Sequence, residues 1–223
     1  GVSIYPGVDY AGSLYVADIT TPKSLEADIP FEMLTHANMR GLVGKRAADT
    51  HKGTYGHLFI LAGSPGKSGA AALASLGALR AGTGLVTAGI PESLNTIMEI
   101  KTTEAMTEPL PETAYGTFGD ISATRAKEII SANKTAVAIG PGISTTDDAR
   151  EFLYQIIRTS PVPLLVDADG LTLVAEKPGI LKKARVPVIL TPHPGEMSRL
   201  AGISTEDVQD DRVGVSLGFA REY

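Results

Sequence analysis

The sequence predicts an α/β fold, a mostly parallel sheet with helices covering both of its faces. From His57 onward, short apolar runs rich in β-branched residues alternate with longer windows of helical periodicity. The runs are nearly continuous rather than alternating, which is typical of strands buried on both faces. Glycine-rich or acidic turns follow several of them, as expected where a strand leads into a crossover helix.

The expected strands are five short apolar runs, residues 57–62, 85–90, 135–139, 163–166 and 187–190. The expected helices separate or follow them, at residues 69–81, 93–100, 123–132, 146–158, 171–176 and 195–201. A further helix is expected to start at Ser204, because Asp207 stands three residues later, in the spacing of a capping box.

The N-terminal part of the sequence differs from the rest. Residues 1–22 hold one strand-like run, residues 14–19, among Gly and Pro turns, and they are too few to form a core of their own. Residues 23–43 have weak periodicity and are expected to be a connector. We expect the main domain to cover residues 44–223, with its boundary near Gly44. The chain begins without Met and ends inside a helical pattern, so we expect both ends to be cut.

Composition and charge exclude several classes of function. With 223 residues and 43% apolar content, the chain is long enough for one domain with a substantial core and an appended segment. Its 20 Lys and Arg against 25 Asp and Glu give a net charge of −5, so no broad basic surface for nucleic acid is expected. Without cysteine, or an apolar run of about 20 residues, we expect no disulfide and no membrane segment, and a cytoplasmic location.

A glycine-rich loop from Gly63 to Ala71 follows the first expected strand. A strand that leads through such a loop into a helix directs backbone N–H groups and the positive end of the helix dipole at one spot, which suits phosphate. The Gly-Lys-Ser segment inside the loop is not a P-loop, because Leu61 stands where that motif needs a glycine. The alternative is a turn that needs glycine only for its backbone angles.

Two further segments follow expected strands. Gly140 and Gly142 flank a proline at a strand end, where open α/β sheets bind ligands, and a plain strand-to-loop turn is the alternative. Asp167 and Asp169 follow the next strand, and carboxylates there suit sugar hydroxyls or a metal ion with its waters. Asp169 could instead cap the helix that begins near Leu171.

His193 lies between Pro192 and Pro194 after the last expected strand. The prolines leave it little backbone freedom, so a rigid binding residue in the same crevice is favoured over a purely structural histidine. The alternative role of Glu196, in the first turn of the next helix, is to complement the helix dipole.

Six segments of the sequence, taken together in their order and spacing, resemble a known family, although no single segment is specific to it. The set comprises residues 51–56 (His-Lys-Gly-Thr-Tyr-Gly), 63–71, 107–111 (Thr-Glu-Pro-Leu-Pro), 140–142 (Gly-Pro-Gly), 167–170 (Asp-Ala-Asp-Gly) and 191–196 (Thr-Pro-His-Pro-Gly-Glu). Together they resemble the ribokinase-like NAD(P)H-hydrate dehydratases, which repair hydrated NADH and NADPH. An aromatic residue is usual in that family near Lys67, so this chain departs from the pattern there.

The resemblance implies a ribokinase-like fold and a repair reaction. ADP or ATP would phosphorylate the hydroxyl of the hydrated nicotinamide ring, usually with Mg²⁺, and loss of the phosphate would regenerate NAD(P)H. Residues 1–22 resemble the tail of an NAD(P)H-hydrate epimerase domain, which precedes the dehydratase in bifunctional bacterial enzymes, with K⁺ as a candidate ion for that part. We also expect a homo-oligomer, with neither nucleic acid nor membrane as a partner.

The resemblance also implies which residues bind the substrate. They are Gly63, Gly66, Gly69, Ala70, Ala71, Gly140, Gly142, Asp167, Asp169, His193, Pro194, Gly195, Glu196, Met197, Ser198 and Arg199. The Gly63 to Ala71 loop would hold the pyrophosphate of the hydrated dinucleotide, and Gly142 with residues 193–199 would line the rest. The family continues with a Lys-Gly stretch for the adenine nucleotide and a Gly-Thr-Gly-Asp motif, so the catalytic Asp is expected beyond Tyr223. No catalytic residue and no metal ligand are assigned in this chain.

Two alternatives to this function stay open. A ribokinase-like kinase for a small alcohol, such as a vitamin precursor, would share the fold and the nucleotide chemistry. The chain by itself is also consistent with a dinucleotide-binding fragment that lacks activity of its own.

Overall fold

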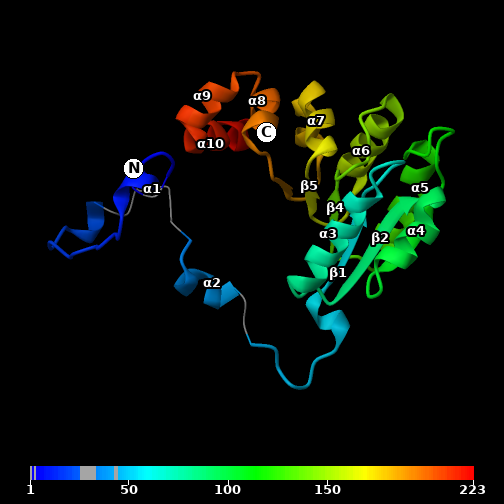
Figure 1. The fold of residues 1–223 in the computed structure, drawn as a ribbon, viewed down its shortest axis with the longest axis horizontal. Coiled ribbons are helices and arrows are strands. Elements are labelled where there is room, and N and C mark those ends of the chain that lie inside the picture. The colour runs from blue at the N-terminus through cyan, green and yellow to red at the C-terminus, as the bar shows by residue number, and fades with distance from the viewer. Residues whose placement is uncertain (1, 3, 26–33, 43–44) are drawn as a thin grey trace. The chain divides into compact units, whose positions relative to one another are not determined.

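The structure is a computed structural model that describes residues 2, 4–25, 34–42 and 45–223 (Figure 1). The chain divides into two units, residues 1–48 and residues 49–223. The expected boundary near Gly44 lies outside the described residues. The division into an epimerase-like remnant, a connector and a dehydratase domain therefore stays a prediction.

The described residues of the first unit contain little regular structure. Its elements are the helix α1 (Val8–Ala11), the 3₁₀ turn η1 (Lys23–Leu25) and the helix α2 (His36–Leu42). The strand-like run at residues 14–19 adopts neither helix nor strand, and Val16 within it is 92% exposed. A strand needs a neighbour to pair with, and an apolar run does not by itself supply one.

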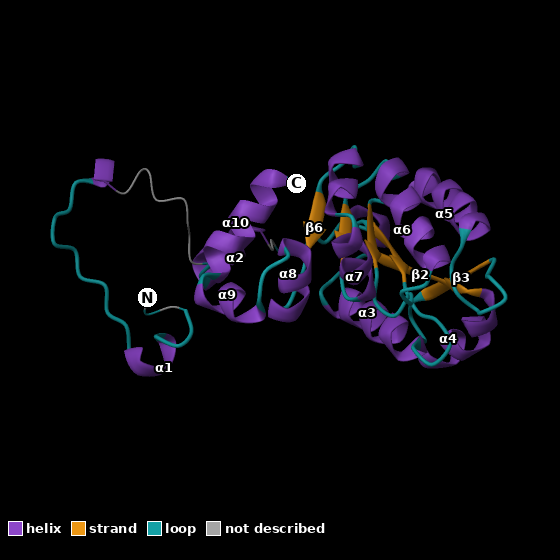
Figure 2. Ribbon diagram, turned by 90° about the horizontal axis from the view of Figure 1, so that it is seen from above, coloured by secondary structure: helices purple, strands orange, loops and turns teal. Residues whose placement is uncertain are grey.

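The second unit is built on a parallel sheet of six strands in the order β3-β2-β1-β4-β5-β6 (Figures 1 and 2). The strands are β1 (His57–Leu61), β2 (Leu85–Pro91), β3 (Met106–Leu110), β4 (Ala136–Ile139), β5 (Leu164–Val166) and β6 (Val188–Leu190). All neighbouring pairs are parallel. The chain runs outward from β1 to β3 and then returns to place β4 on the other side of β1. The strand order therefore reverses between β1 and β4.

The edge strand β3 is absent from the strands expected from the sequence. It contains Glu108 and Pro109, neither of which is a strand former, and the proline has no backbone N–H to pair. It pairs with β2 on one side, from Thr87↔Met106 to Pro91↔Leu110, and proline is tolerated at such an edge. The other five strands are confirmed to within one residue at each end.

Helices cover both faces of the sheet (Figure 2). They are α3 (Ser68–Arg80), α4 (Asn95–Lys101), α5 (Asp120–Asn133), α6 (Asp147–Thr159), α7 (Asp169–Glu176), α8 (Pro194–Ala201), α9 (Thr205–Asp210) and α10 (Arg212–Glu222), with 3₁₀ turns η2 (Lys52–Tyr55), η3 (Glu92–Leu94) and η4 (Pro178–Lys183). The helices α3 and α4 lie along one face, and α5 and α6 lie along the other. The predicted α/β class is confirmed.

Successive side chains of β1 belong to different apolar cores. Phe59 and Leu61 pack with residues of α5 and α6 such as Phe152, whereas Ile60 packs with residues of α3 and α4 such as Met98. None of these five side chains is more than 1% exposed. A strand directs alternate side chains to opposite faces, so a strand buried on both faces needs the uninterrupted apolar run seen in the sequence.

The capping box expected at Ser204 is confirmed. Ser204 Oγ accepts a hydrogen bond from the backbone N–H of Asp207 at 3.0 Å, and Asp207 Oδ2 accepts one from the backbone N–H of Ser204 at 3.3 Å. These reciprocal bonds satisfy two N–H groups at the start of α9, so the local sequence alone defines where this helix begins.

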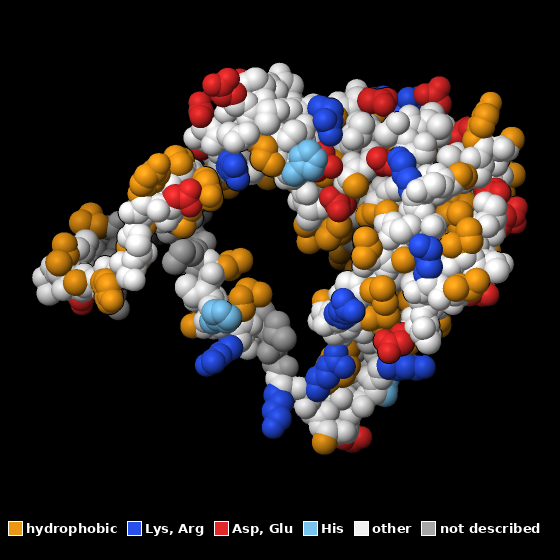
Figure 3. All heavy atoms as spheres, in the orientation of Figure 1, with side chains coloured by type: hydrophobic (Ala, Val, Ile, Leu, Met, Phe, Trp, Pro, Cys, Tyr) orange, Lys and Arg blue, Asp and Glu red, His pale blue; other side chains and the backbone are white. Residues whose placement is uncertain are grey.

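Charged side chains of both signs are interspersed over the face of the second unit drawn in Figure 3. Among the residues that the structure describes, no helix is long and apolar enough to cross a bilayer.

Candidate functional site

Four loops follow the carboxyl ends of β1, β4, β5 and β6, and because these strands are parallel the loops share one edge of the sheet. Open α/β sheets bind ligands at this edge, where the strand order reverses. Here the reversal lies between β1 and β4. The glycine-rich loop after β1 and the Gly140 to Gly142 loop after β4 therefore flank the position where a ligand is expected.

The glycine-rich loop has two residues in left-handed backbone conformations, Gly63 with φ +87° and Gly66 with φ +79°. At these two positions the turn itself requires glycine, whatever binds to it. Lys67 follows and precedes α3 without a side-chain cap, so the positive end of the 13-residue helix faces the loop. Gly69 and Ala70 lie in its first turn, and Ala71 is fully buried.

The loop after β4 packs directly on its neighbours. A Cβ on Gly140 would lie 1.9 Å from the carbonyl oxygen of Asp167, and one on Gly142 would lie 3.0 Å from Lys67 Cβ and 3.1 Å from Ala70 Cβ. The backbone N–H of Gly63 donates to the carbonyl of Pro141 at 2.9 Å. The glycines thus bring the loops after β1, β4 and β5 into contact, which is a packing reason for their presence.

The two carboxylates after β5 have different surroundings. The backbone N–H of Asp167 donates a hydrogen bond to the carbonyl of Ile139, in β4, at 3.1 Å. Asp169 Oδ2 accepts hydrogen bonds from Lys67 Nζ at 2.7 Å and from the backbone N–H of Ser144 at 3.0 Å. The alternative that Asp169 caps the following helix is wrong, because α7 begins at Asp169 itself and its N-cap residue, Ala168, makes no side-chain cap. The carboxylate instead joins three loops.

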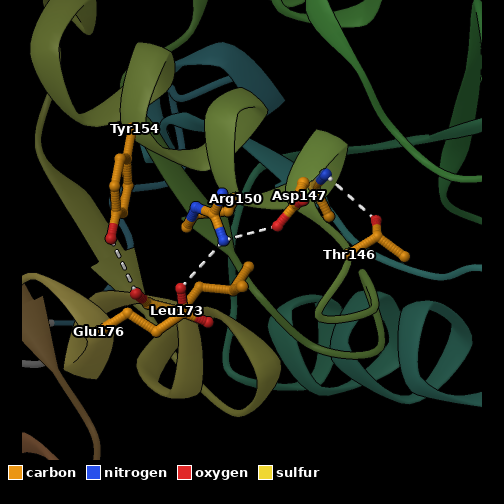
Figure 4. A network of polar contacts seen from close by, with 7 residues as sticks. Thr146, Asp147, Arg150, Tyr154, Leu173 and Glu176 are labelled. Atoms are coloured by element: carbon orange, nitrogen blue, oxygen red, sulfur yellow. Dashed lines mark hydrogen bonds and ion pairs between the residues drawn. The ribbon is translucent and has the colours of Figure 1, made fainter.

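A polar network holds α7, and with it Asp169, against α6 (Figure 4). Arg150 Nη1 lies 2.7 Å from Asp147 Oδ1 and 3.0 Å from Glu176 Oε2. The hydroxyl of Tyr154 donates to the carbonyl of Leu173 at 3.0 Å, and burial raises the pKa of Tyr154. The C-terminal half of α7 is therefore held on α6.

His193 is the N-cap residue of α8. Its Nδ1 accepts hydrogen bonds from the backbone N–H groups of Gly195 at 3.0 Å and Glu196 at 3.3 Å, and Glu196 Oε2 accepts from the backbone N–H of His193 at 2.9 Å. Because Nδ1 accepts, the ring proton lies on Nε2, which is 3.4 Å from Glu196 Oε1. His193 thus combines a structural role with a 65% exposed side chain that leaves Nε2–H as a donor.

The other predicted residues of α8 differ in how far their side chains are buried. Pro194 occupies the first helical turn, where its missing N–H costs nothing. Met197 is 5% exposed and belongs to the apolar core, whereas Arg199 is exposed. Ser198 Oγ donates to the carbonyl of Gly195 at 3.0 Å. Of the predicted residues in α8, Arg199 thus has the most accessible side chain.

Sequence patterns gave no sign of two contacts at this edge. The ion pair between Lys67 and Asp169 joins residues 102 positions apart. The loop after β3 lies against the glycine-rich loop, since a Cβ on Gly116 would be 2.7 Å from Pro65 Cγ. The first contact requires knowledge of the strand order, and the second requires β3, which the sequence did not reveal.

Two cavities lie beside the outer strands of the sheet, and the first is also lined by Pro192 of the loop after β6. One of about 580 Å³ borders β6 and α10 and is lined mainly by apolar side chains, including Leu190, Met197 and Phe219. The other, of about 670 Å³, borders β3 and α5 and includes Glu108 and Arg125. The described residues contain no group of three or more His, Cys, Asp or Glu placed to hold a metal ion.

Comparison with protein families gives one match over most of the chain. A family model described as NAD(P)H-hydrate dehydratase matches residues 58–223. The bifunctional NAD(P)H-hydrate repair enzyme Nnr of Moorella thermoacetica is 40% identical over 225 residues, which cover 100% of this chain and 42% of that protein. The ADP-dependent (S)-NAD(P)H-hydrate dehydratase of Bacillus subtilis is 34% identical, over 88% of this chain and 63% of that protein. The chain thus spans about two fifths of the length of the bifunctional relative.

Solved structures show the same likeness. The ADP/ATP-dependent NAD(P)H-hydrate dehydratase from Bacillus subtilis, co-crystallized with ATP and Mg²⁺, has a TM-score of 0.65 and 32% identity, covering 81% of this chain and 59% of that one. A ribokinase-like superfamily protein from Enterococcus faecalis, 19% identical with a TM-score of 0.61 over 75% of this chain and 57% of its own, shares the fold. The ribokinase-like fold is confirmed, and the chain belongs to the NAD(P)H-hydrate dehydratase family.

Proposed function

We propose that the protein containing this chain repairs nicotinamide nucleotides by dehydrating (S)-NAD(P)H hydrate to NAD(P)H at the expense of ADP or ATP. The observation that carries the proposal is the contact between the glycine-rich loop and the Gly140 to Gly142 loop at the reversal of strand order, within a chain of this family. The contact places the glycine-rich loop, and the uncapped start of α3 that suits phosphate, where such sheets bind nucleotides.

The proposed reaction has two steps. The hydroxyl of the hydrated ring accepts a phosphoryl group from the nucleotide, and loss of that phosphate together with a ring proton restores the double bond. The adenine nucleotide with Mg²⁺ would supply the phosphoryl group and screen its charge. The catalytic base is proposed to lie beyond Tyr223, so the described residues would bind and orient the substrate.

Within the site, the Gly63 to Ala71 loop and the start of α3 would hold the pyrophosphate. The uncapped helix end supports this assignment, because its dipole favours negative charge. Gly142 and residues 193–199 would line the rest of the dinucleotide. His193 supports this part by offering Nε2–H as a donor while its other ring nitrogen caps α8. Asp167 and Asp169 would face the sugar hydroxyls of the dinucleotide.

The test is a dehydratase assay on the full-length protein with (S)-NADH hydrate or (S)-NADPH hydrate. We expect the absorbance of the reduced nicotinamide ring to return only when ADP or ATP with Mg²⁺ is present. Phosphorylation of hydroxymethyl vitamin precursors, with no recovery of NADH, would instead establish the small-molecule kinase. If the protein binds the dinucleotide but shows neither activity, it is a dinucleotide-binding module rather than an enzyme.

Four further properties belong to the same proposal. The full-length protein would be a bifunctional epimerase and dehydratase, which the relative from Moorella thermoacetica supports by its name. K⁺ would serve the epimerase part. A homo-oligomer and a cytoplasmic location complete the proposal, and size measurement in solution with cell fractionation would test them.

A further inference from the structure

The ion pair between Lys67 and Asp169 spans the candidate site. Lys67 comes from the glycine-rich loop after β1, and Asp169 opens α7 after β5, so the pair crosses the loop of the intervening strand β4. The two side chains are 48% and 25% exposed, respectively. A ligand that approaches this edge of the sheet therefore reaches both groups.

Asp169 Oδ2 has the surroundings of a bound anion. One ammonium group, Lys67 Nζ, and one backbone N–H, that of Ser144, both donate to this single oxygen, at 2.7 Å and 3.0 Å. A phosphate oxygen is bound by proteins through the same two kinds of donor. The carboxylate thus occupies a place that the chemistry of a phosphate oxygen would also suit.

The backbone around the carboxylate is held in uncommon conformations. Ser144, which donates to it, has φ +77°, and Ala168, which precedes it, has φ +51°. Non-glycine residues rarely adopt positive φ, and such conformations persist only where the surrounding structure enforces them. The packed loops after β4 and β5 therefore fix both the donor and the acceptor.

Lys67 is positioned to serve a ligand as well. Its Cβ lies beside Gly142, and its residue immediately precedes the uncapped start of α3. The ammonium group is thus carried by the loop whose N–H groups are proposed to hold the pyrophosphate. A small rotation of a long, half-exposed side chain is enough to exchange one anionic partner for another.

We infer that Lys67 binds a phosphate group of the dinucleotide and that Asp169 is its partner only while the ligand is absent. The inference rests on the proposed function and deepens it by assigning a side chain to phosphate recognition. Asp169 then competes with the ligand for Lys67, so its negative charge weakens phosphate binding.

The experiment compares Lys67→Gln, Asp169→Asn and the double variant in the full-length protein, with Lys127→Gln on α5 as the control. Binding of NADPH, NADH and inorganic pyrophosphate is measured by calorimetry at low and high salt. We expect Lys67→Gln to weaken binding by about five- to tenfold and to reduce its salt dependence. Asp169→Asn should strengthen binding by about threefold, and the double variant should match Lys67→Gln.

Two results would overturn the inference. If both single variants weaken binding to the same extent, the pair acts only by joining the loops. If neither changes binding relative to Lys127→Gln, the pair is not in the site. Thermal unfolding of each variant separates a loss of fold from a loss of contact.

Steady-state kinetics provides the second measurement. We expect Lys67→Gln to raise KM for the hydrated dinucleotide with little change in kcat, because the contact is the same in the ground state and the transition state. If the unmodified protein binds no dinucleotide and dehydrates none, the proposed function itself fails. A working enzyme whose KM is unchanged in Lys67→Gln contradicts this inference alone.

Discussion

Two parts of the candidate site are held together in opposite ways. The loops after β1, β4 and β5 are joined by contacts between distant residues, such as the Gly140 position against Asp167 and the Lys67 to Asp169 ion pair. The cap of α8 after β6 is held mainly by its own neighbours, since the side chains of His193 and Glu196 bond to backbone N–H groups of residues 193, 195 and 196. Substitutions in the first part should therefore disturb several loops at once, and substitutions in the second should stay local.

The largest effect is expected at Gly140. In Gly140→Ala, the new Cβ would meet the carbonyl of Asp167 at 1.9 Å in a residue with φ +128°, so the loops after β4 and β5 must separate. We expect a loss of about 3 kcal/mol or more in the free energy of unfolding. Urea unfolding measures this loss.

Gly66→Ala is the matched control. Gly66 also has positive φ, at +79°, but nothing lies within 4 Å of its added Cβ, so only the backbone cost of about 1 kcal/mol is expected. Equal losses in the two variants would mean that backbone angle, not contact between loops, requires glycine at Gly140.

A smaller and local effect is expected at His193. His193→Ala removes the N-cap of α8 and should cost about 1 kcal/mol in the free energy of unfolding. His193→Asn should recover that stability, because the amide oxygen can cap the helix in place of Nδ1.

The same pair of variants separates capping from ligand binding. Since asparagine lacks Nε2, both variants should weaken NADPH binding by about five- to tenfold in calorimetry. Full binding by His193→Asn would restrict His193 to its structural role.

The Lys67 to Asp169 pair should add little to stability despite its length of 2.7 Å. Both side chains are partly solvated, and such pairs contribute about 0.5 kcal/mol. A double-variant cycle on urea unfolding measures this coupling. A coupling above about 2 kcal/mol would make the pair a structural element of the site rather than a contact that a ligand can displace.

The smallest effect is expected at the amino ends of the strands, away from the candidate site, where His57 begins β1. Burial, and secondarily the charge of Lys134, lowers the pKa of His57 below its usual 6.5. The unfolded chain therefore takes up a proton before the folded protein does. The contribution of neutral His57 to stability is complete above pH 6.5 and is lost as the pH falls through and below it.

His57→Gln tests this dependence, because glutamine can keep a hydrogen bond to Thr87 Oγ1, which lies 2.8 Å from His57 Nε2, and does not titrate. Urea midpoints between pH about 7.5 and about 5.5 should fall less steeply in the variant. An unchanged slope would assign the pH dependence to other groups.

The same contrast explains how much the sequence could predict. Local patterns were sufficient for the capping box at Ser204 and for the five apolar strands, because their contacts lie within a few residues or follow from burial on both faces. The edge strand Met106–Leu110, which contains a proline, was not predicted from the sequence, because an edge position is a property of the whole sheet. The apolar run at residues 14–19 had the local pattern of a strand but no partner.

At the site, the sequence identified the loops but not their connections. The glycine-rich loop and the Gly140 to Gly142 loop were predicted from their composition, and the sheet order brings them together. The partners of Asp169 were missed, because Lys67 and Ser144 reach it only after β1, β4 and β5 have assembled. Helix capping was the simplest local explanation for that carboxylate, and the tertiary contacts replaced it.

The reversal of strand order also determines when the site can arise during synthesis. The strands β1 to β3 leave the ribosome together with α3 and α4, whereas Leu58 must wait for Ala136 to complete its pairing with β4. The helix α6, whose Phe152 belongs to the same apolar core as Phe59 and Leu61, follows later still. A nascent chain halted before β4 therefore has no crevice, and the β1 edge and part of its apolar face stay uncovered, which favours aggregation at this stage.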